Sequence, residues 1–509
     1  MKTMLALTLS LIAVTATFTT SAMARNVVGA RVSIDTGRIA GTPERGTIAF
    51  RGIPFAAAPA GPLRWKAPKP PTAWQGIRDA SKFGAACPQP EWPDAWARVG
   101  RKDEDCLFLN VWRPERPGKY PVMVFIHGGA FSLGAAGVPL YDGAALAERG
   151  AVIVTINYRL GRFGFFAHPA LTAEDPKGLL GNYGIMDQIA ALKWVQRNID
   201  RFGGDRSNVT IFGESAGAGS VQILMGAPAA KGLFQKAISQ SGAGNSVLPP
   251  ISGGKASPEA LGKAWTDSIG LKDATPSQLR AISVDEIVKG GRGFPILDGK
   301  VVTRSPGDYF YSRTAARVPL MIGFNSHEAS LGFNEAVAKG LLGADFADLQ
   351  AAYVARTGRD PARAAIDLAA DVAFALPSYA VADWHAGAGN QTYAYYFDQV
   401  PVDQRAKLPG AGHGSEMEYL FGNMATDNRW DAIDTRVSKQ MGDYWVRFAR
   451  TGNPNGNGAS NWPATTTAPT TYLHIGDTMR VERLSADRER VKAISVAPAI
   501  KGWAAAPKP

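Results

Sequence analysis

Cysteine is scarce in this sequence: only 2 of its 509 residues are Cys. This scarcity excludes a disulfide-rich scaffold and the cysteine clusters of structural zinc sites. A chain of this length buries enough apolar surface to fold without either device. Cys87 and Cys106 leave two possibilities open, one disulfide formed in an oxidising compartment or two free buried thiols.

Runs of like charge are also missing, although the formal net charge is +11. Lys and Arg are scattered singly, and neither an RNA-binding aromatic signature nor zinc-finger spacing is present. We therefore expect a dispersed, solvated surface and no nucleic-acid partner. His327-Glu328 lacks the second His that a zinc motif needs, because Leu331 occupies its position. We expect no metal and no cofactor.

Residues 1–24 have the pattern of a signal peptide. Lys2 gives a positive start, an apolar run extends from Met4 to Phe18, and Ala22-Met23-Ala24 is a small-x-small cleavage site. The alternative is a membrane anchor, but the apolar run is too short to span a bilayer comfortably. The sequence predicts cleavage near Ala24, a secreted or periplasmic protein, and no membrane span in the mature chain.

Strand-like and helix-like segments alternate along the rest of the chain, with no internal repeat and no long low-complexity segment. This alternation predicts an α/β fold on a large, mostly parallel central sheet flanked by helices. Segments 245–300 and 331–390 are less regular and rich in helix formers, and we expect them to be helical insertions that cover the functional site. The expected strands are 122–126, 152–156, 209–212, 237–239, 320–323 and 392–397, and the expected helices are 185–202 and 431–449.

The segment Gly213-Glu214-Ser215-Ala216-Gly217 directly follows the strand 209–212, and residues 218–225 can continue as a helix. A strand, a sharp turn and a helix are the context in which G-x-S-x-G forms a nucleophile elbow. Glycine is needed on both sides because the turn is too tight for side chains. The pattern predicts Ser215 as a nucleophile held at the carboxyl edge of the sheet.

Four blocks of the sequence carry a family resemblance. Residues 202–217, which begin Phe-Gly-Gly and end in the elbow, are similar to the signature of the type-B carboxylesterase/lipase family of the α/β-hydrolase superfamily. Residues 50–55, 104–112 and 445–455 resemble further blocks of that family. The resemblance implies an exported bacterial-type carboxylesterase whose residues 25–509 form one α/β-hydrolase domain, and it implies a disulfide between Cys87 and Cys106.

Ester hydrolysis places negative charge on the substrate carbonyl oxygen, so N–H donors should point at that oxygen. One donor is expected from the backbone of Ala216, next to the nucleophile. The turn after the first expected strand has the sequence H-G-G-A-F. The family pattern implies that Gly129 and Ala130 donate there and that Gly128 shapes the turn. Phe131 is expected to line the substrate pocket, and the alternative is an ordinary glycine-rich loop.

A serine hydroxyl needs a base, and in α/β-hydrolases the acid and then the histidine follow the serine in the chain. Among 6 histidines, His413 lies in a glycine-rich loop that resembles the family's H-G-x-[DE] block, whereas His474 ends a strand-like stretch. Glu328 follows the strand 320–323 and matches G-x-N-x-x-E, although Ala329 replaces the usual Gly. The alternative for Glu328 is a solvated loop carboxylate. With a histidine base, activity should fall below about pH 6.5.

Two further positions are implied as supporting residues. The family places a buried Glu at the position of Glu214, where it assists the site electrostatically, and Ser241 matches a serine in its network. The alternative for Glu214 is a carboxylate that faces the helix dipole. Trp96 has the spacing before Cys106 of the cation-binding Trp of cholinesterases. A loop Trp packing on the surface is the alternative, since the positive net charge does not favour a cationic substrate.

Together these patterns predict a serine hydrolase that cleaves a small-molecule carboxylic ester through an acyl-enzyme, with Ser215, His413 and Glu328 as its triad. A first alternative is a non-catalytic binding or adhesion module on the same fold. A second is lipase, cholinesterase-like or peptidase specificity, because one set of catalytic residues serves esters and some amides alike. The sequence leaves the natural substrate and the oligomeric state open.

Overall fold

The computed structural model describes residues 30–44, 46–91, 99–175, 178–423, 429–456, 460–466 and 471–505. The expected signal peptide, residues 1–24, lies outside the described residues, and so does Trp96. Both interpretations therefore stay predictions.

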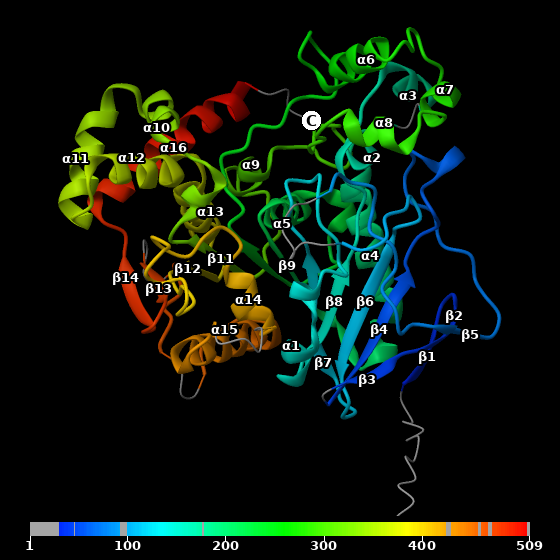
Figure 1. Ribbon diagram of the computed structural model, residues 1–509, viewed down its shortest axis with the longest axis horizontal. Coiled ribbons are helices and arrows are strands. Elements are labelled where there is room, and N and C mark those ends of the chain that lie inside the picture. Colours follow the sequence, from blue (N-terminus) through cyan, green and yellow to red (C-terminus); the bar gives the residue numbers. More distant parts are fainter. Residues whose placement is uncertain are drawn as a thin grey trace, which may run out of the picture.

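The centre of the protein is an eleven-stranded mixed sheet with the strand order β14-β13-β12-β11-β10-β9-β7-β8-β6-β4-β3 (Figure 1). From β13 across to β8 all neighbouring strands are parallel, and antiparallel pairs lie at both ends of the sheet. The predicted mostly parallel sheet is confirmed. Its strands are β3 (Thr42–Glu44), β4 (Thr47–Pro54), β6 (Phe108–Pro114), β7 (Tyr120–Ile126), β8 (Val152–Ile156), β9 (Gly204–Glu214), β10 (Lys236–Gln240), β11 (Leu320–Asn325), β12 (Thr392–Phe397), β13 (Thr471–Ile475) and β14 (Arg480–Arg483).

A second, three-stranded sheet joins β1 (Arg31–Ile34), β2 (Gly37–Ala40) and β5 (Ile77–Asp79). Every strand expected from the sequence is present, although β9 starts five residues earlier than the expected strand 209–212. The expected helix 185–202 is α4 (Tyr183–Asn198) followed by a 3-10 turn, η4 (Ile199–Phe202). The expected helix 431–449 is α15 (Ala432–Thr451).

Apolar side chains on both faces of the central strands produce two core layers. Along β7, Val122, Val124 and Ile126 face one layer, and Met123 and Phe125 face the other. This arrangement explains why the strand reads as a continuous apolar run rather than an alternating one. Helices α4 and α5 (Ala216–Gly226) cover the first layer, and α1 (Ala144–Glu148), α14 (Glu416–Phe421) and α15 cover the second.

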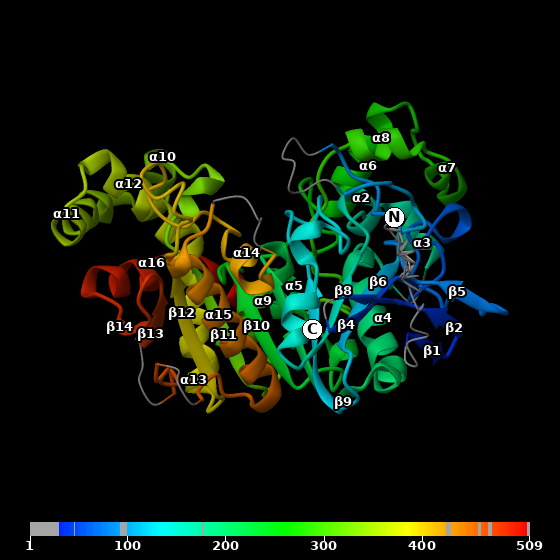
Figure 2. The same ribbon diagram turned by 60° about the horizontal axis from the view of Figure 1, so that its bottom comes forward.

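Two groups of helices stand on opposite sides of the same end of the protein (Figures 1 and 2). They correspond to the two irregular segments of the sequence. The first group is α6 (Pro258–Ser268), α7 (Pro276–Arg280) and α8 (Val284–Lys289), and the second is α10 (Glu335–Leu342), α11 (Phe346–Thr357) and α12 (Pro361–Ala370). The π-helical turn η8 (Asp371–Ala375) continues α12 into α13 (Leu376–Gly387), which packs against β11 and β12 of the central sheet. The remaining helices are α2 (Gly161–Gly164), α3 (Pro169–Glu174), α9 (Pro306–Tyr311) and α16 (Ala486–Ala505), and a short 3-10 turn, η6 (Glu328–Leu331), follows β11.

One helical stretch among the described residues, Pro361–Gly387, is long and apolar enough to cross a membrane. Within the protein, 72% of its most apolar window is buried. Burial of this kind is the arrangement of a core helix in a globular protein. The expectation that the mature chain has no membrane span stays a prediction.

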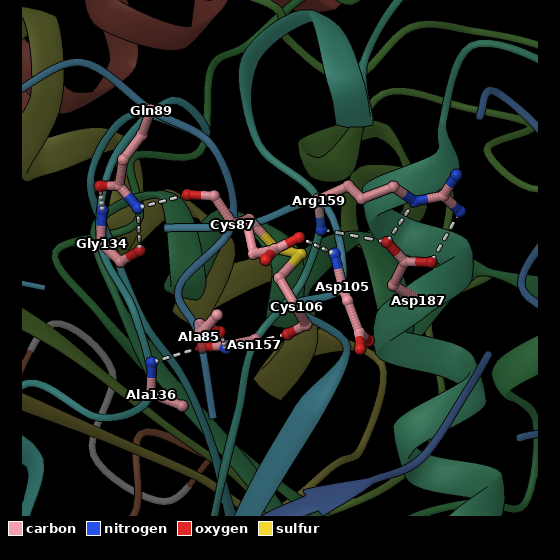
Figure 3. The surroundings of a disulfide bond; sticks show 11 residues. Ala85, Cys87, Gln89, Asp105, Cys106, Gly134, Ala136, Asn157, Arg159 and Asp187 are labelled. Carbon is pink, nitrogen blue, oxygen red and sulfur yellow. Dashed lines mark hydrogen bonds and ion pairs between the residues drawn. A yellow bond between two sulfur atoms is a disulfide. The ribbon is translucent and has the colours of Figure 1, made fainter. Parts of the chain in front are cut away.

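Cys87 and Cys106 form a disulfide with an S–S distance of 2.00 Å, as the family resemblance implied (Figure 3). Two amide side chains connect its surroundings to the loop after the H-G-G-A-F turn. Gln89 exchanges hydrogen bonds with the backbone of Gly134 (2.8 Å each), and Asn157 binds the carbonyl of Cys106 (2.9 Å) and the N–H of residue 136 (2.7 Å). The disulfide therefore lies in the same bonded framework as the predicted oxyanion turn.

Candidate active site

Ser215 lies in the sharp turn between β9 and α5, with φ 56° and ψ −123°. A residue other than glycine rarely adopts a positive φ, and such strain persists only where the surroundings enforce it. The flanking glycines make the turn possible. A Cβ atom on Gly217 would lie 1.9 Å from the carbonyl oxygen of Ile126, and one on Gly213 would lie 2.6 Å from the carbonyl carbon of Gly217. The expected elbow geometry is therefore present.

The H-G-G-A-F turn lies directly against this elbow. A Cβ atom on Gly128 would lie 3.0 Å from the Cβ of Ser215 and 2.6 Å from Oε2 of Glu214, so only glycine fits there. Gly129, Ala130 and Phe131 follow with φ values of 102°, 51° and 57°. Three successive residues with positive φ form a tight backbone turn beside Ser215.

Three N–H groups at this junction are free to bind a ligand. Ala216 is the first residue of α5, so its N–H has no acceptor within the helix. Within the described part of the chain, the N–H groups of Gly129, Ala130 and Ala216 donate no hydrogen bond. Free donors next to a nucleophile are what an oxyanion hole requires.

His127 supports the turn from behind. Its ring stacks on the ring of Tyr158 with centroids 4.6 Å apart, and the Tyr158 hydroxyl donates to the His127 carbonyl at 2.9 Å. Burial lowers the pKa of His127 to about 4, so its imidazole is neutral at physiological pH. His127 therefore has a structural place here and carries no charge near the substrate.

His413 and Glu328 are in direct contact although 85 residues separate them: Nδ1 of His413 lies 2.6 Å from Oε2 of Glu328. The other oxygen of Glu328 accepts hydrogen bonds from the Asn325 N–H (2.8 Å) and the Ser241 hydroxyl (2.6 Å). Ser241 thus binds Glu328 rather than Glu214, which differs from the network that the resemblance implied. These bonds fix the carboxylate that orients the imidazole.

The loops that carry Glu328 and His413 are joined by their backbones. His327 pairs with Gly412 in an isolated parallel bridge, and the His327 N–H donates to the Ala411 carbonyl at 2.8 Å. The His413 N–H donates to the Ser330 hydroxyl at 2.9 Å. The two loops therefore hold each other in register. No sequence pattern at either loop predicted this backbone pairing.

The opposite nitrogen of His413 faces the elbow. Nε2 lies 3.1 Å from Oε1 of Glu214, yet neither atom has a hydrogen-bond partner among the described residues. Within the same residues the Ser215 hydroxyl makes no hydrogen bond to His413. The structure therefore brings the imidazole to the residue next to Ser215 with Nε2 free of a hydrogen-bonded partner. In unliganded sites, catalytic hydrogen bonds are often formed only in the substrate complex.

A third carboxylate, Glu416, belongs to this cluster and is the last residue of the H-G-x-[DE] block that begins at His413. It is fully buried and accepts hydrogen bonds from the side chains of Asn325 (2.5 Å) and Gln240 (3.3 Å). Asn325 also donates to the carbonyl of Gly412 at 2.7 Å. Asn325 therefore links the loop of Glu328, the loop of His413 and the Glu416 carboxylate.

Burial and mutual repulsion perturb the carboxylates and the imidazole. Burial raises the pKa of Glu214 to about 7 and that of Glu416 to about 8. Burial opposes a charge on His413 as well, but the Glu214 and Glu328 carboxylates outweigh it and raise the pKa of His413 to about 9. The cluster is thus arranged to stabilise a positive charge on the imidazole.

The geometry has a counterpart among known proteins: the sequence matches the carboxylesterase family over residues 29–493. The chain belongs to the carboxylesterase family. The resemblance found in the sequence is confirmed, and so is the expected enzyme class, an ester hydrolase.

Individual members of this family are similar over most of the chain. A fumonisin B1 esterase of Sphingopyxis macrogoltabida is 37% identical over 81% of each chain. A para-nitrobenzyl esterase of Bacillus subtilis is 36% identical over 85% of this chain and 92% of its own. A solved structure of a PNB esterase has a TM-score of 0.80 and 33% identity over 91% of this chain and 99% of its own. The α/β-hydrolase fold is confirmed.

Phe131 packs edge-on against Phe165 (centroids 5.2 Å apart) and reaches Phe294 of the 245–300 insertion (6.4 Å). This aromatic group lies beside the oxyanion turn, since the Phe131 carbonyl accepts the Gly161 N–H at 2.7 Å. The role of Phe131 in lining the substrate pocket stays a prediction. In the described ranges, no group of three His, Cys, Asp or Glu side chains could hold a metal ion.

Proposed function

We propose that this carboxylesterase hydrolyses small-molecule carboxylic esters through an acyl-enzyme, with Ser215 as nucleophile, His413 as base and Glu328 as the orienting acid. One observation carries the proposal. The His413 imidazole is bound through Nδ1 to Glu328 at 2.6 Å and presents Nε2 to the strained elbow that holds Ser215. The similarity to esterases of small organic esters supports the same substrate class.

In the proposed reaction, the Ser215 oxygen attacks the ester carbonyl carbon while Nε2 of His413 takes the hydroxyl proton. The negative carbonyl oxygen then accepts hydrogen bonds from the N–H groups of Gly129, Ala130 and Ala216. Collapse of this intermediate breaks the C–O bond to the alcohol, which leaves with the proton from His413. Water then attacks the acyl-enzyme by the same path and releases the acid and free Ser215.

Charge stabilisation at the imidazole supports this assignment. The proton that His413 accepts converts it to a cation between two carboxylates, Glu328 at Nδ1 and Glu214 at Nε2. Ser241 and Asn325 hold Glu328 in place, so the carboxylate needs little reorganisation when the cation forms. We assign Glu214 and Ser241 supporting roles in this charge stabilisation.

We further propose that residues 25–509 form one domain and that the protein works outside the cytoplasm. The signal-peptide pattern of residues 1–24 is the main support. The Cys87–Cys106 disulfide adds to it, because such bonds persist in oxidising compartments.

The test compares Ser215→Ala with the wild type, using p-nitrophenyl acetate and butyrate and a fluorophosphonate probe. We expect the wild type to turn over both esters and to be labelled, and Ser215→Ala to lose turnover by about 10⁴-fold or more and to lose labelling. Ser252→Ala, an exposed serine in the 245–300 insertion, is the matched control and should behave as wild type. A wild type without turnover or labelling would instead favour a binding module on this fold.

A further inference from the structure

A single aromatic side chain of the 331–390 insertion reaches the proposed base. The ring centroid of Phe374 lies 5.3 Å from that of the His413 imidazole, with an interplanar angle of 76°. This is the edge-to-face geometry that aromatic pairs prefer. Phe333 lies behind Phe374, with ring centroids 6.3 Å apart, and does not itself pair with the imidazole. Both rings are partly exposed.

Phe374 is presented by a π-helical turn, η8, which interrupts a helix that otherwise runs from Pro361 to Gly387. The sequence supplies the reason. In an uninterrupted α-helix, Pro377 would lack an N–H and its ring would collide with the carbonyl of Ala373. A π-turn absorbs such a conflict by inserting an extra residue and changing the direction of the side chains around it.

The start of this turn is fixed by a largely buried ion pair. Asp371, its first residue, accepts two hydrogen bonds from Arg488 of α16, at 3.0 and 3.1 Å, and one from the Tyr353 hydroxyl at 2.6 Å. The Arg488 guanidinium is buried over the rings of Phe324 and Tyr396. A buried charge pair of this kind is costly to break from one side, so η8 has a defined position.

The imidazole of His413 needs such a contact. Its only directed hydrogen bond within the described residues runs from Nδ1 to Glu328, and a ring held by one bond can still swivel about it. The bonds from Ser330 and Asn325 hold the backbone of this loop, but they do not fix the rotation of the ring about its side-chain bonds. A ring pressed against one side of the imidazole removes this swivel and keeps Nε2 directed at the elbow.

We propose that Phe374 is a positioning residue for His413, held by the π-turn and its Asp371–Arg488 anchor. The proposal rests on the proposed role of His413 as the base. It explains why a conformation as rare as a π-turn occurs in the insertion at the point where that insertion meets the imidazole. Because Phe374 acts on the base, its loss should slow catalysis without weakening substrate binding.

The test measures kcat and KM for p-nitrophenyl acetate, with rates normalised to the sites that a fluorophosphonate titrates. For Phe374→Leu we expect kcat to fall about three- to ten-fold, from the typical strength of an edge-to-face aromatic contact, with KM within about two-fold. Phe374→Tyr keeps an aromatic ring and should retain most of the wild-type kcat. Phe333→Leu, which removes the ring one step further from the imidazole, should stay near wild type. If Phe374→Leu does not fold, Phe374→Met of similar volume replaces it.

Three outcomes would overturn the proposal: an unchanged kcat in Phe374→Leu, a raised KM at unchanged kcat, or an equal loss in Phe333→Leu. The second would make Phe374 a substrate-binding residue, and the third would make the effect a general one of the insertion. Failure of the proposed function is separable from all three. In that case the wild type itself would neither titrate with the fluorophosphonate nor turn over the ester.

Discussion

Removing the charge of Glu214 should change the pH at which the enzyme works. Its Oε1 lies 3.1 Å from Nε2 of His413, and it is the foremost of the charges that raise the pKa of this imidazole. A histidine with a raised pKa stays protonated, and therefore cannot act as a base, up to a higher pH. In Glu214→Gln the imidazole should deprotonate earlier, so the acid side of the activity profile should move to lower pH.

The structure sets the size of this shift. The pKa of His413 rises from 6.5 to about 9 even though burial acts in the opposite direction. Glu328 keeps its hydrogen bond to Nδ1 in the variant, so only part of this rise should disappear. We expect the acid limb to move down by about one to two pH units, equivalent to about 1.4 kcal/mol per unit. The difference in kcat/KM between the two proteins should be largest between about pH 7 and pH 9. Burial raises the pKa of Glu214 to about 7, so its charge is present above that pH, and above about pH 9 both imidazoles are neutral.

The assay is kcat/KM for p-nitrophenyl acetate across the pH range, read at the isosbestic wavelength of p-nitrophenol. Glu416→Gln is the matched control, because Glu416 is equally buried but binds Asn325 and Gln240 instead of the imidazole. Glu416→Gln should shift the acid limb of the pH profile much less than Glu214→Gln does. The reasoning is wrong if Glu214→Gln leaves the limb in place or moves it upward. The maximum rate can also fall, since Glu214 stabilises the imidazolium, but this does not affect the position of the limb.

Two further changes have defined outcomes. Glu328→Gln should lower kcat by about 10³-fold or more while the protein stays folded, because the neutral amide no longer stabilises the cation at Nδ1 of His413; near-normal kcat would exclude Glu328 as the acid. Replacing Cys87 and Cys106 together by Ser should lower the free energy of unfolding by about 2–4 kcal/mol, because their disulfide closes a loop with a sequence separation of 19. Denaturant titration measures this, and dithiothreitol should destabilise the wild type but not the variant.

The activity limit near pH 6.5 expected from the sequence assumed an unperturbed histidine. In the structure three buried carboxylates surround His413, so the expected pH limit of activity lies above 6.5. The six carboxylate oxygens come from β9, η6 and α14, and their proximity is not visible in the chain order. A pKa depends on distances in space, and for this reason the sequence could single out the proposed base but not the pH at which it would work.

Local patterns determined much of this protein. The apolar runs of the central strands, the glycines around Ser215 and the H-G-G-A-F turn each encode a geometry within a few residues, because backbone sterics and side-chain burial act at short range. The sequence therefore predicted the parallel core of the sheet, the elbow and the neighbouring turn, and each matches the structure. It also singled out His413 and Glu328, which the fold brings into contact.

Tertiary structure alone decided what depends on partners far apart in the chain. Their own pattern left the two cysteines free or bonded, and only the family resemblance implied the disulfide that the fold forms by placing them together. Ser241 was assigned to the network of Glu214, yet its hydroxyl donates a hydrogen bond to Glu328.

Two residues near His413 were not recognised from the sequence. Glu416 is bound through Asn325, and Phe374 reaches His413 only because a π-turn, held by a residue of the last helix, presents it. Such long-range contacts follow from packing of whole elements, and no periodicity or short motif records them.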